Sequence, residues 1–243
     1  MFSGDRSTDK TSTSYLLFYL DKREMKINKV YLWEHQIRPH KPNNVERYYN
    51  FAWKSLADFK ANWWYDIVTN GSYTINADGI KQTSSSNDRS IVASVVLPDI
   101  STAKKIEVYQ SWYYKYANRS TWKEILLSSD WTLSPTNYLR FTVSFTSNSW
   151  YRTTDLALNW TSIYSIQQQR TTWLTEIKMI IDFENKTVQT IVSWANTWDR
   201  TDNLTDEQLT AIKALTYVEA QQGRWYSSEN NEYIQSMWYK IYF

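Results

Sequence analysis

From about residue 63 onward, the chain is a succession of short segments rich in β-branched and aromatic residues, separated by turn signals. The motifs NG, ADG, SSSND and LPD mark the first of these turns. We expect about nine strands, at residues 72–76, 79–83, 90–97, 105–116, 122–127, 138–146, 172–183, 188–193 and 233–242. Many short strands with a single late helix predict a mainly β fold, a two-sheet antiparallel sandwich of jelly-roll type.

Two of these segments carry the clearest strand signals. Residues 177–183 and 188–192 are joined by the polar stretch ENKT, which predicts a β-hairpin. In the segment 138–146, Leu139, Phe141 and Val143 alternate with polar residues. This period of two is typical of a strand that packs one face on a core and exposes the other to solvent.

Two helix starts are visible. Thr205 with Gln208 three residues later has the pattern of a capping box, followed by a stripe of apolar residues. Ser55 with Asp58 has a similar pattern, which predicts a short helix of one or two turns. These two helices are the exceptions in a strand-rich sequence.

The N-terminal part divides differently. We assign residues 1–24 to a flexible leader or arm, residues 25–45 to a short attachment hairpin with strands at 27–32 and 36–39, and residues 46–243 to the sandwich. Met25 can also be a natural start, so a misplaced start codon stays open. The apolar run at 15–20 is shorter than the core of a signal peptide, so we expect neither a signal peptide nor a transmembrane segment.

Composition argues against several function classes. The formal net charge of +2 is too small to indicate nucleic acid or an anionic membrane as partner. The chain has no cysteine, and its two histidines, His35 and His40, have too few potential ligands nearby for a metal site. It also lacks a Gly-x-Ser-x-Gly elbow and a glycine-rich phosphate loop. We therefore expect no catalytic residues, no cofactor and no metal.

Four glycines and fourteen tryptophans are unusual counts. The indoles can form a surface for sugars or partner proteins, or they can fill the core. A third hypothesis follows from Trp33, Trp160 and Trp194, which stand where a turn favours glycine. If the source organism decodes UGA as glycine, these residues are glycines in the native protein. All three interpretations stay open at the level of sequence.

The segment 26–39 resembles a short hairpin near the start of many bacteriophage tail and head fibre proteins, apart from Trp33, where those proteins carry glycine. The matching residues are Lys29, Val30, Tyr31, Leu32, Gln36, Ile37, Arg38 and Pro39. The resemblance implies a location on the virion, at the tail or capsid surface. It also implies partners among other virion proteins or sister chains, including a homotrimer.

A second resemblance covers residues 172–243, which are similar to the last strands of concanavalin-like and laminin-G-like sandwiches. This likeness implies glycan or protein binding and no reaction. Hydrolases of that fold carry the motif Glu-x-Asp-x-Glu on one strand. Here Ile180 takes the first acidic position before Asp182 and Glu184, so the carboxylate pair that a retaining mechanism needs is missing.

Our candidate glycan-binding residues are three aromatic residues in polar surroundings, Trp150, Tyr151 and Trp198, together with Arg152, which can bond sugar hydroxyl groups. Rings of this kind stack on sugars, but they can equally anchor loops onto the sandwich. We expect a non-catalytic virion adhesion module that binds a host-surface glycan or a neighbouring virion protein. The alternative is a lectin-like or glycoside-hydrolase-like protein encoded by a bacterial host.

Overall fold

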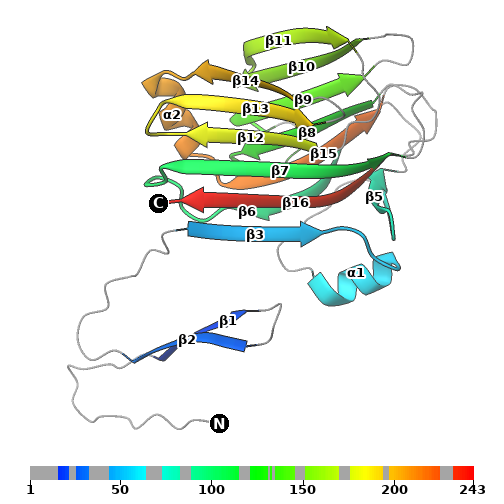
Figure 1. Ribbon diagram of the computed structural model, residues 1–243, viewed down its shortest axis with the longest axis vertical. Coiled ribbons are helices and arrows are strands. Elements are labelled where there is room, and N and C mark those ends of the chain that lie inside the picture. Colours follow the sequence, from blue (N-terminus) through cyan, green and yellow to red (C-terminus); the bar gives the residue numbers. More distant parts are fainter. Residues whose placement is uncertain are drawn as a thin grey trace. The chain divides into compact units, whose positions relative to one another are not determined.

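The chain forms two compact units, Met1–Pro42 and Asn43–Phe243, shown in a computed structural model (Figure 1). The structure describes residues 16–21, 26–32, 44–63, 73–82, 89–114, 121–130, 132, 135–145, 151–169, 176–193, 197–224 and 232–243.

The N-terminal unit contains one antiparallel pair, β1 (Leu16–Asp21) and β2 (Lys26–Leu32). We assigned β1 to the leader, but it pairs with β2 along its whole length, as its apolar and aromatic residues allow. The attachment residues Lys29 to Leu32 lie in β2, and the partner strand expected at 36–39 lies outside the described residues. The attachment role and the boundaries after residues 24 and 45 stay predictions.

The second unit contains two antiparallel sheets. The eight-stranded sheet has the order β14-β13-β12-β7-β16-β5-β4, with β3 also paired to β16. Its strands are β3 (Asn44–Asn50), β4 (Tyr73–Asn76), β5 (Gly79–Gln82), β7 (Lys105–Tyr114), β12 (Glu176–Asp182), β13 (Thr187–Ser193), β14 (Trp198–Asn203) and β16 (Glu232–Tyr242). The six-stranded sheet has the order β11-β10-β9-β8-β15-β6. Its strands are β6 (Arg89–Val96), β8 (Thr121–Ser128), β9 (Tyr138–Phe145), β10 (Tyr151–Leu158), β11 (Thr161–Gln169) and β15 (Tyr217–Arg224).

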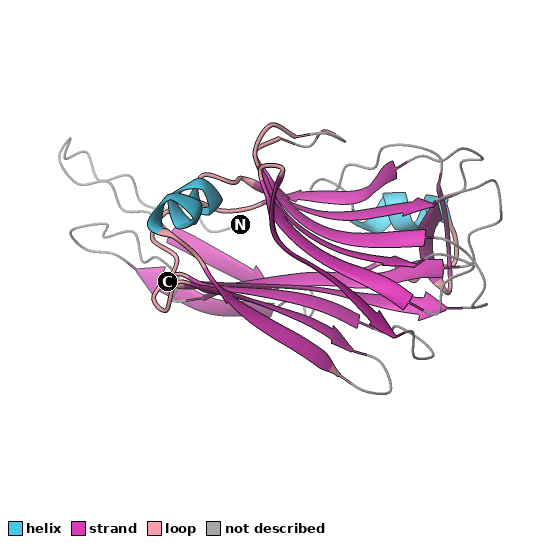
Figure 2. Cartoon of the chain, turned by 90° about the horizontal axis from the view of Figure 1, so that it is seen from above, coloured by secondary structure: helices cyan, strands magenta, loops and turns pink. Residues whose placement is uncertain are grey.

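The two sheets form separate layers, seen end-on in Figure 2, and their facing sides make the core. On β12, Ile177, Met179 and Ile181 are completely buried, while the residues between them are half-buried. On β9, Phe141 and Val143 are buried in the same core. Period-two alternation on both sheets therefore produces one continuous apolar layer.

The two helices begin where the sequence predicts. Helix α2 (Asp206–Lys213) has a complete capping box, in which the Gln208 amide N–H donates to the Thr205 hydroxyl and the Thr205 amide donates to the Gln208 side chain. Helix α1 (Leu56–Trp63) follows Ser55, whose hydroxyl accepts from the Asp58 amide. No helix in the described part of the chain is long and apolar enough to span a bilayer.

The sandwich prediction is confirmed, including the hairpin of β12 and β13. The estimate of about nine strands was wrong, because strands β3, β10, β11, β14 and β15 were missed in this unit. Strand β14, with the sequence WDRTDN, shows why: it lies at the sheet edge and has no fully buried residue. Without a buried face, its sequence lacks the alternation that signals a strand.

Strands β10 and β11 are joined by a two-residue turn at Asn159 and Trp160. Both residues have positive φ, 46° and 69°, as in the type I′ turn, for which Asn-Gly is the preferred sequence. A bulky residue rarely adopts this conformation. Position 160 therefore has the backbone of a glycine, as the decoding hypothesis predicts, while Trp33 and Trp194 lie outside the described residues.

We expect Trp160→Gly to stabilise the fold by about 1 kcal/mol, because it removes the left-handed strain of a residue with a Cβ atom. Urea unfolding of the recombinant chain measures the change. Trp160→Ala is the control, since it removes the exposed indole but keeps the strain. Equal stabilities of the two variants would argue against a glycine position.

Intact-mass measurement of the protein from its native source tests the decoding hypothesis directly. Each tryptophan that is glycine in the native protein lowers the mass by the difference between the two residues. A mass that matches fourteen tryptophans would remove the hypothesis.

Candidate functional site

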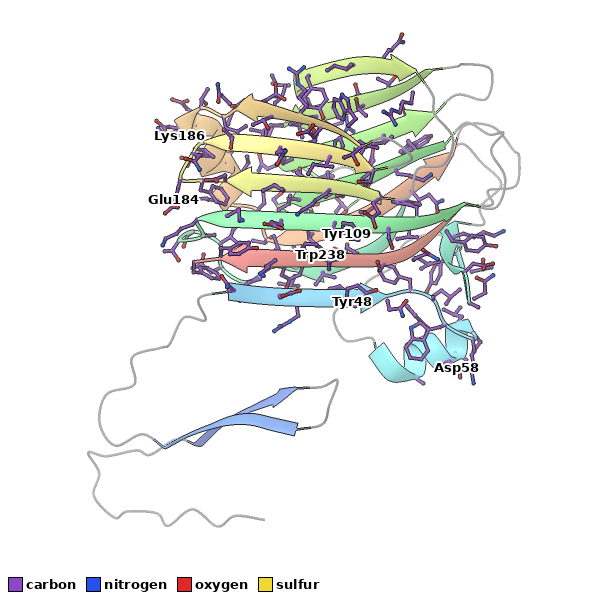
Figure 3. All side chains as sticks on the ribbon, in the orientation of Figure 1. Tyr48, Asp58, Tyr109, Glu184, Lys186 and Trp238 are labelled. Atoms are coloured by element: carbon purple, nitrogen blue, oxygen red, sulfur yellow. The ribbon has the colours of Figure 1, made fainter. Side chains whose placement is uncertain are left out.

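Three aromatic side chains lie side by side on the outer face of the eight-stranded sheet (Figure 3). Trp238 on β16 is opposite Tyr48 on β3 and opposite Tyr109 on β7. The rings of Tyr109 and Trp238 are stacked, with centroids 5.3 Å apart and planes 25° from parallel. We call Tyr48, Trp238 and Tyr109 the aromatic row.

The alternation of β16 explains why the row faces outward. Met237 and Tyr239 point into the core and are buried, so Trp238 and Lys240 point to the other face, where they are only partly covered. At the edge strand β3, Tyr48 keeps 40% of its surface exposed. An outer sheet face with neighbouring aromatic residues is thus available to a ligand.

Polar groups flank the row on one side. Ser236 lies opposite both Asn50 and Ser111, and Glu176 lies opposite Ser111 on the far strand. The hydroxyl oxygens of Ser111 and Ser236 are 2.7 Å apart. Burial, together with a hydrogen bond to the Glu176 carboxylate, raises the pKa of the Tyr109 hydroxyl above its ordinary value. This phenol therefore stays protonated and can donate a hydrogen bond.

Charged groups flank the row on the other side. The Glu107 carboxylate forms ion pairs with Lys178 at 2.8 Å and with Lys105 at 2.9 Å. Burial acts to raise the pKa of Glu107, but the hydrogen bonds from both lysines outweigh it and lower this pKa overall. Further along, Lys240 lies 3.9 Å from Glu46.

The arrangement combines aromatic rings with polar and charged groups beside them. The Lys178 ammonium lies 5.5 Å from the centre of the Trp238 ring and so helps to hold the stacked pair in place. Because Trp238 and Tyr109 stack on each other, a ligand meets their edges and the exposed ring of Tyr48. Hydroxyl, amide and carboxylate groups beside the rings can bond the hydroxyl groups of a sugar.

The residues predicted to bind glycans lie elsewhere. Trp150 is outside the described residues, and Tyr151 begins strand β10, where its side chain is not described. Arg152 faces the core at 3% exposure, and this burial lowers the pKa of its guanidinium to about 9. Trp198 begins β14 and packs edge-on against Tyr164, with centroids 6.3 Å apart. The glycan-binding role of these four residues stays a prediction.

Sequence reasoning missed the aromatic row. Tyr109 and Trp238 both lie in strands that the sequence predicts, and each occupies an outward position of its strand. Their outward positions could therefore have been found from the sequence. The pairing of β3 with β16, which brings Tyr48 beside them, depends on contacts between the two ends of the sandwich sequence and has no local signature.

The outer face of the six-stranded sheet holds a buried acidic cluster. Glu219 on β15 accepts hydrogen bonds from Ser128 at 2.6 Å and from Gln221 at 2.8 Å. On the neighbouring strand, Glu124 accepts from Thr142 at 3.0 Å. Glu219 and Glu124 are 0% and 1% exposed. As the structure stands, neither carboxyl group is open to a polysaccharide.

This face corrects one expectation about β9. We expected its polar side to meet solvent, but Tyr138 and Thr142 on that side are buried. The phenol oxygen of Tyr138 accepts a hydrogen bond from the Trp160 amide in the β10–β11 turn. Thr142 is held by Glu124. Alternation reveals the two faces of a strand, but it cannot reveal what covers the polar one.

Burial raises the pKa of Glu219 to about 7; the hydrogen bonds from Ser128 and Gln221 oppose this effect, and the charges of Asp130 and Glu124 add to it. A carboxyl group whose pKa is higher in the folded state favours folding most at low pH. We expect this stability to fall as pH rises from about 4.5 through about 7, by up to about 3 kcal/mol.

Urea unfolding at pH 5 and pH 8 checks the prediction, with Glu219→Gln as the matched variant that stays neutral. The variant should lose this part of the pH dependence and be more stable than the parent at pH 8. An unchanged pH dependence in Glu219→Gln would contradict the assignment.

No protein-family profile matches the sequence, and no curated protein matches it. Several solved structures, however, have a similar fold. The chain is similar to lectin II from Ulex europaeus, with a TM-score of 0.55 and 11% identity over 82% of this chain and 99% of that one. It is similar to peanut lectin in complex with a nine-residue peptide, with a TM-score of 0.57 and 11% identity over 82% and 97%.

A third similar structure is the CBM2 module of the evolved Dit protein of Lactobacillus casei BL23 phage J-1. Its TM-score is 0.52 at 8% identity, over 85% of this chain and 93% of that module. At such identities the likeness establishes the fold alone. The chain has a two-sheet β-sandwich fold similar to that of these lectins.

Proposed function

We propose that this protein is a non-catalytic carbohydrate-binding module of a bacteriophage particle, a component of a tail or head fibre. The sandwich binds a glycan of the host surface on the outer face of its eight-stranded sheet. The N-terminal unit attaches the module to other virion proteins or to sister chains, as a homotrimer.

The aromatic row is the observation that carries the binding proposal. Three rings on three adjacent strands, one of them 40% exposed, lie between a polar and a charged group of side chains. Aromatic residues with converging polar groups are characteristic of sites that bind amphipathic ligands such as sugars. The rings are carried by paired strands, so little conformational entropy is lost on binding.

The similar structures support a saccharide as the ligand class. One is lectin II of Ulex europaeus in complex with galactose, and another is basic winged bean lectin with Tn-antigen. The fold alone does not fix a ligand. The aromatic row is therefore the main support for binding, and these complexes make a saccharide the first ligand to test.

The location on a virion rests on two separate observations. The hairpin motif at residues 26–39 resembles the start of phage fibre proteins, and one similar structure is a module of a phage protein. Mass spectrometry of purified virions tests this part. A neighbouring virion protein is the competing partner for the outer face, and a lectin or hydrolase encoded by the bacterial host is the competing source.

The absence of catalysis is part of the proposal. Asp182, the central acidic residue of the motif that hydrolases of this fold carry, accepts hydrogen bonds from the amides of Glu184 and Asn185 and so stabilises a turn. Incubation with host polysaccharide should release no new reducing ends. Release that is abolished by Asp182→Asn would overturn this part.

We expect Trp238→Ala to weaken glycan binding by about tenfold or more, because central aromatic residues dominate binding energy. A glycan array identifies the best ligand, and titration calorimetry measures the affinity. Trp160→Ala is the matched control: it removes an exposed indole that lies on a turn of the other sheet. Circular dichroism verifies that both variants fold.

Equal affinities of Trp238→Ala and the parent chain would contradict the site. Binding to a purified virion protein in the absence of any glycan ligand would instead favour the competing partner.

A further inference from the structure

We infer that the aromatic row selects uncharged saccharides and rejects acidic ones, such as those that carry uronate groups. This inference rests on the proposed function and names the ligand class of the same site. It follows from the charges that surround the row.

The first observation is that the lysines beside the row already have carboxylate partners. Lys178 and Lys105 both bind Glu107, at 2.8 and 2.9 Å. The side chain of Glu107 is only 12% exposed, and its carboxylate lies between the two ammonium groups. An acidic sugar would have to compete with it for either lysine.

The third lysine has a longer and more exposed contact with a carboxylate. Lys240 lies 3.9 Å from the Glu46 carboxylate and 5.1 Å from the centre of the Tyr242 ring. Lys178 and Lys105 also lie over aromatic rings, those of Trp238 and Tyr242. The ammonium groups therefore pack along the rings as well as pairing with acids.

The second observation is the balance of charge on the strands that carry the row. The outer face of β3, β16, β7 and β12 carries three lysines and four carboxylates. The lysines are Lys105, Lys178 and Lys240, and the carboxylates are those of Glu46, Glu107, Glu176 and Asp182. An approaching anion thus meets no excess of positive charge.

The third observation is the position of these carboxylates. Glu107 lies two residues before Tyr109 on β7, Glu46 lies two residues before Tyr48 on β3, and Glu176 on β12 lies opposite Ser111, two residues after Tyr109. Acids therefore lie on both sides of the row. A carboxylate brought onto the rings would lose water and face like charges, whereas sugar hydroxyl groups can donate hydrogen bonds to the same oxygens.

The test compares two ligands that differ only in charge. One is the neutral oligosaccharide that binds best on the array, and the other is the same oligosaccharide with its primary hydroxyl groups oxidised to carboxylates. Calorimetry with the full chain should give at least about tenfold weaker binding for the oxidised form. The affinity for the neutral form should change little between low and high salt.

Two variants separate a charge effect from a purely steric one. Glu46→Gln removes one carboxylate and leaves Lys240 available, so we expect it to reduce the preference for the neutral form by about threefold or more. Glu184→Gln is the matched control, because this exposed acid lies on the β12–β13 turn, apart from the row (Figure 3). It should leave the preference unchanged.

The outcomes distinguish this inference from the proposed function. Equal or tighter binding of the oxidised form, or an array dominated by acidic glycans, overturns the inference and leaves carbohydrate binding in place. A preference that is unchanged in Glu46→Gln also overturns it, because the rejection is then steric. Failure of every glycan to bind removes the proposed function, and the inference with it.

Discussion

The apolar contact between the two sheets is the constraint on which the rest of this structure depends. The chain has no cysteine to cross-link it, so packing must hold the layers together. Every second residue of β12 is completely buried, and the same period appears on β9 and β16. Because alternation leaves the other half of each strand outside the core, the packing that builds the fold also determines which residues remain for function.

The outer faces of the two sheets carry different kinds of residues. On the eight-stranded sheet, rings and paired charges lie at a partly open surface, where stacking and ion pairing keep them ordered. On the six-stranded sheet, Glu219 and Glu124 are buried. Glu219 accepts hydrogen bonds from Ser128 and Gln221, and Glu124 accepts one from Thr142. A buried carboxyl group costs stability unless it is protonated or well bonded. The first face therefore suits recognition, and the second suits internal structure.

Local features of the fold were readable from the sequence. The Thr205–Gln208 capping box and the β12–β13 hairpin involve residues close together in the chain, so their signals are short and complete. The strands without a buried face, such as β14, gave no signal. The aromatic row joins residues 48, 109 and 238, and only the register of β3 and β7 on β16 brings them together. Such pairing is a property of the whole sheet.

The candidate glycan-binding residues also show that strand register cannot be inferred from local sequence. Trp198 is a candidate because its sequence neighbours are polar, and Arg152 because it follows Trp150 and Tyr151 and can bond sugar hydroxyl groups. Polar neighbours, however, occur on any strand with an outer face. The register turns Arg152 toward the core, next to a face where Thr153 is only partly covered. A shift of one position along a strand separates a buried residue from an accessible one, so composition alone cannot distinguish the two.

The tryptophans are of at least two kinds, and this bears directly on the site. Trp160 is the only tryptophan with positive φ in the described part of the chain, and its backbone is that of a glycine. Trp238 lies within a regular strand, and its ring stacks on Tyr109 beneath the Lys178 ammonium. A source that decodes UGA as glycine can still encode tryptophan with UGG. The decoding hypothesis therefore applies to each codon separately, and the contacts of Trp238 are those of an indole with a structural role.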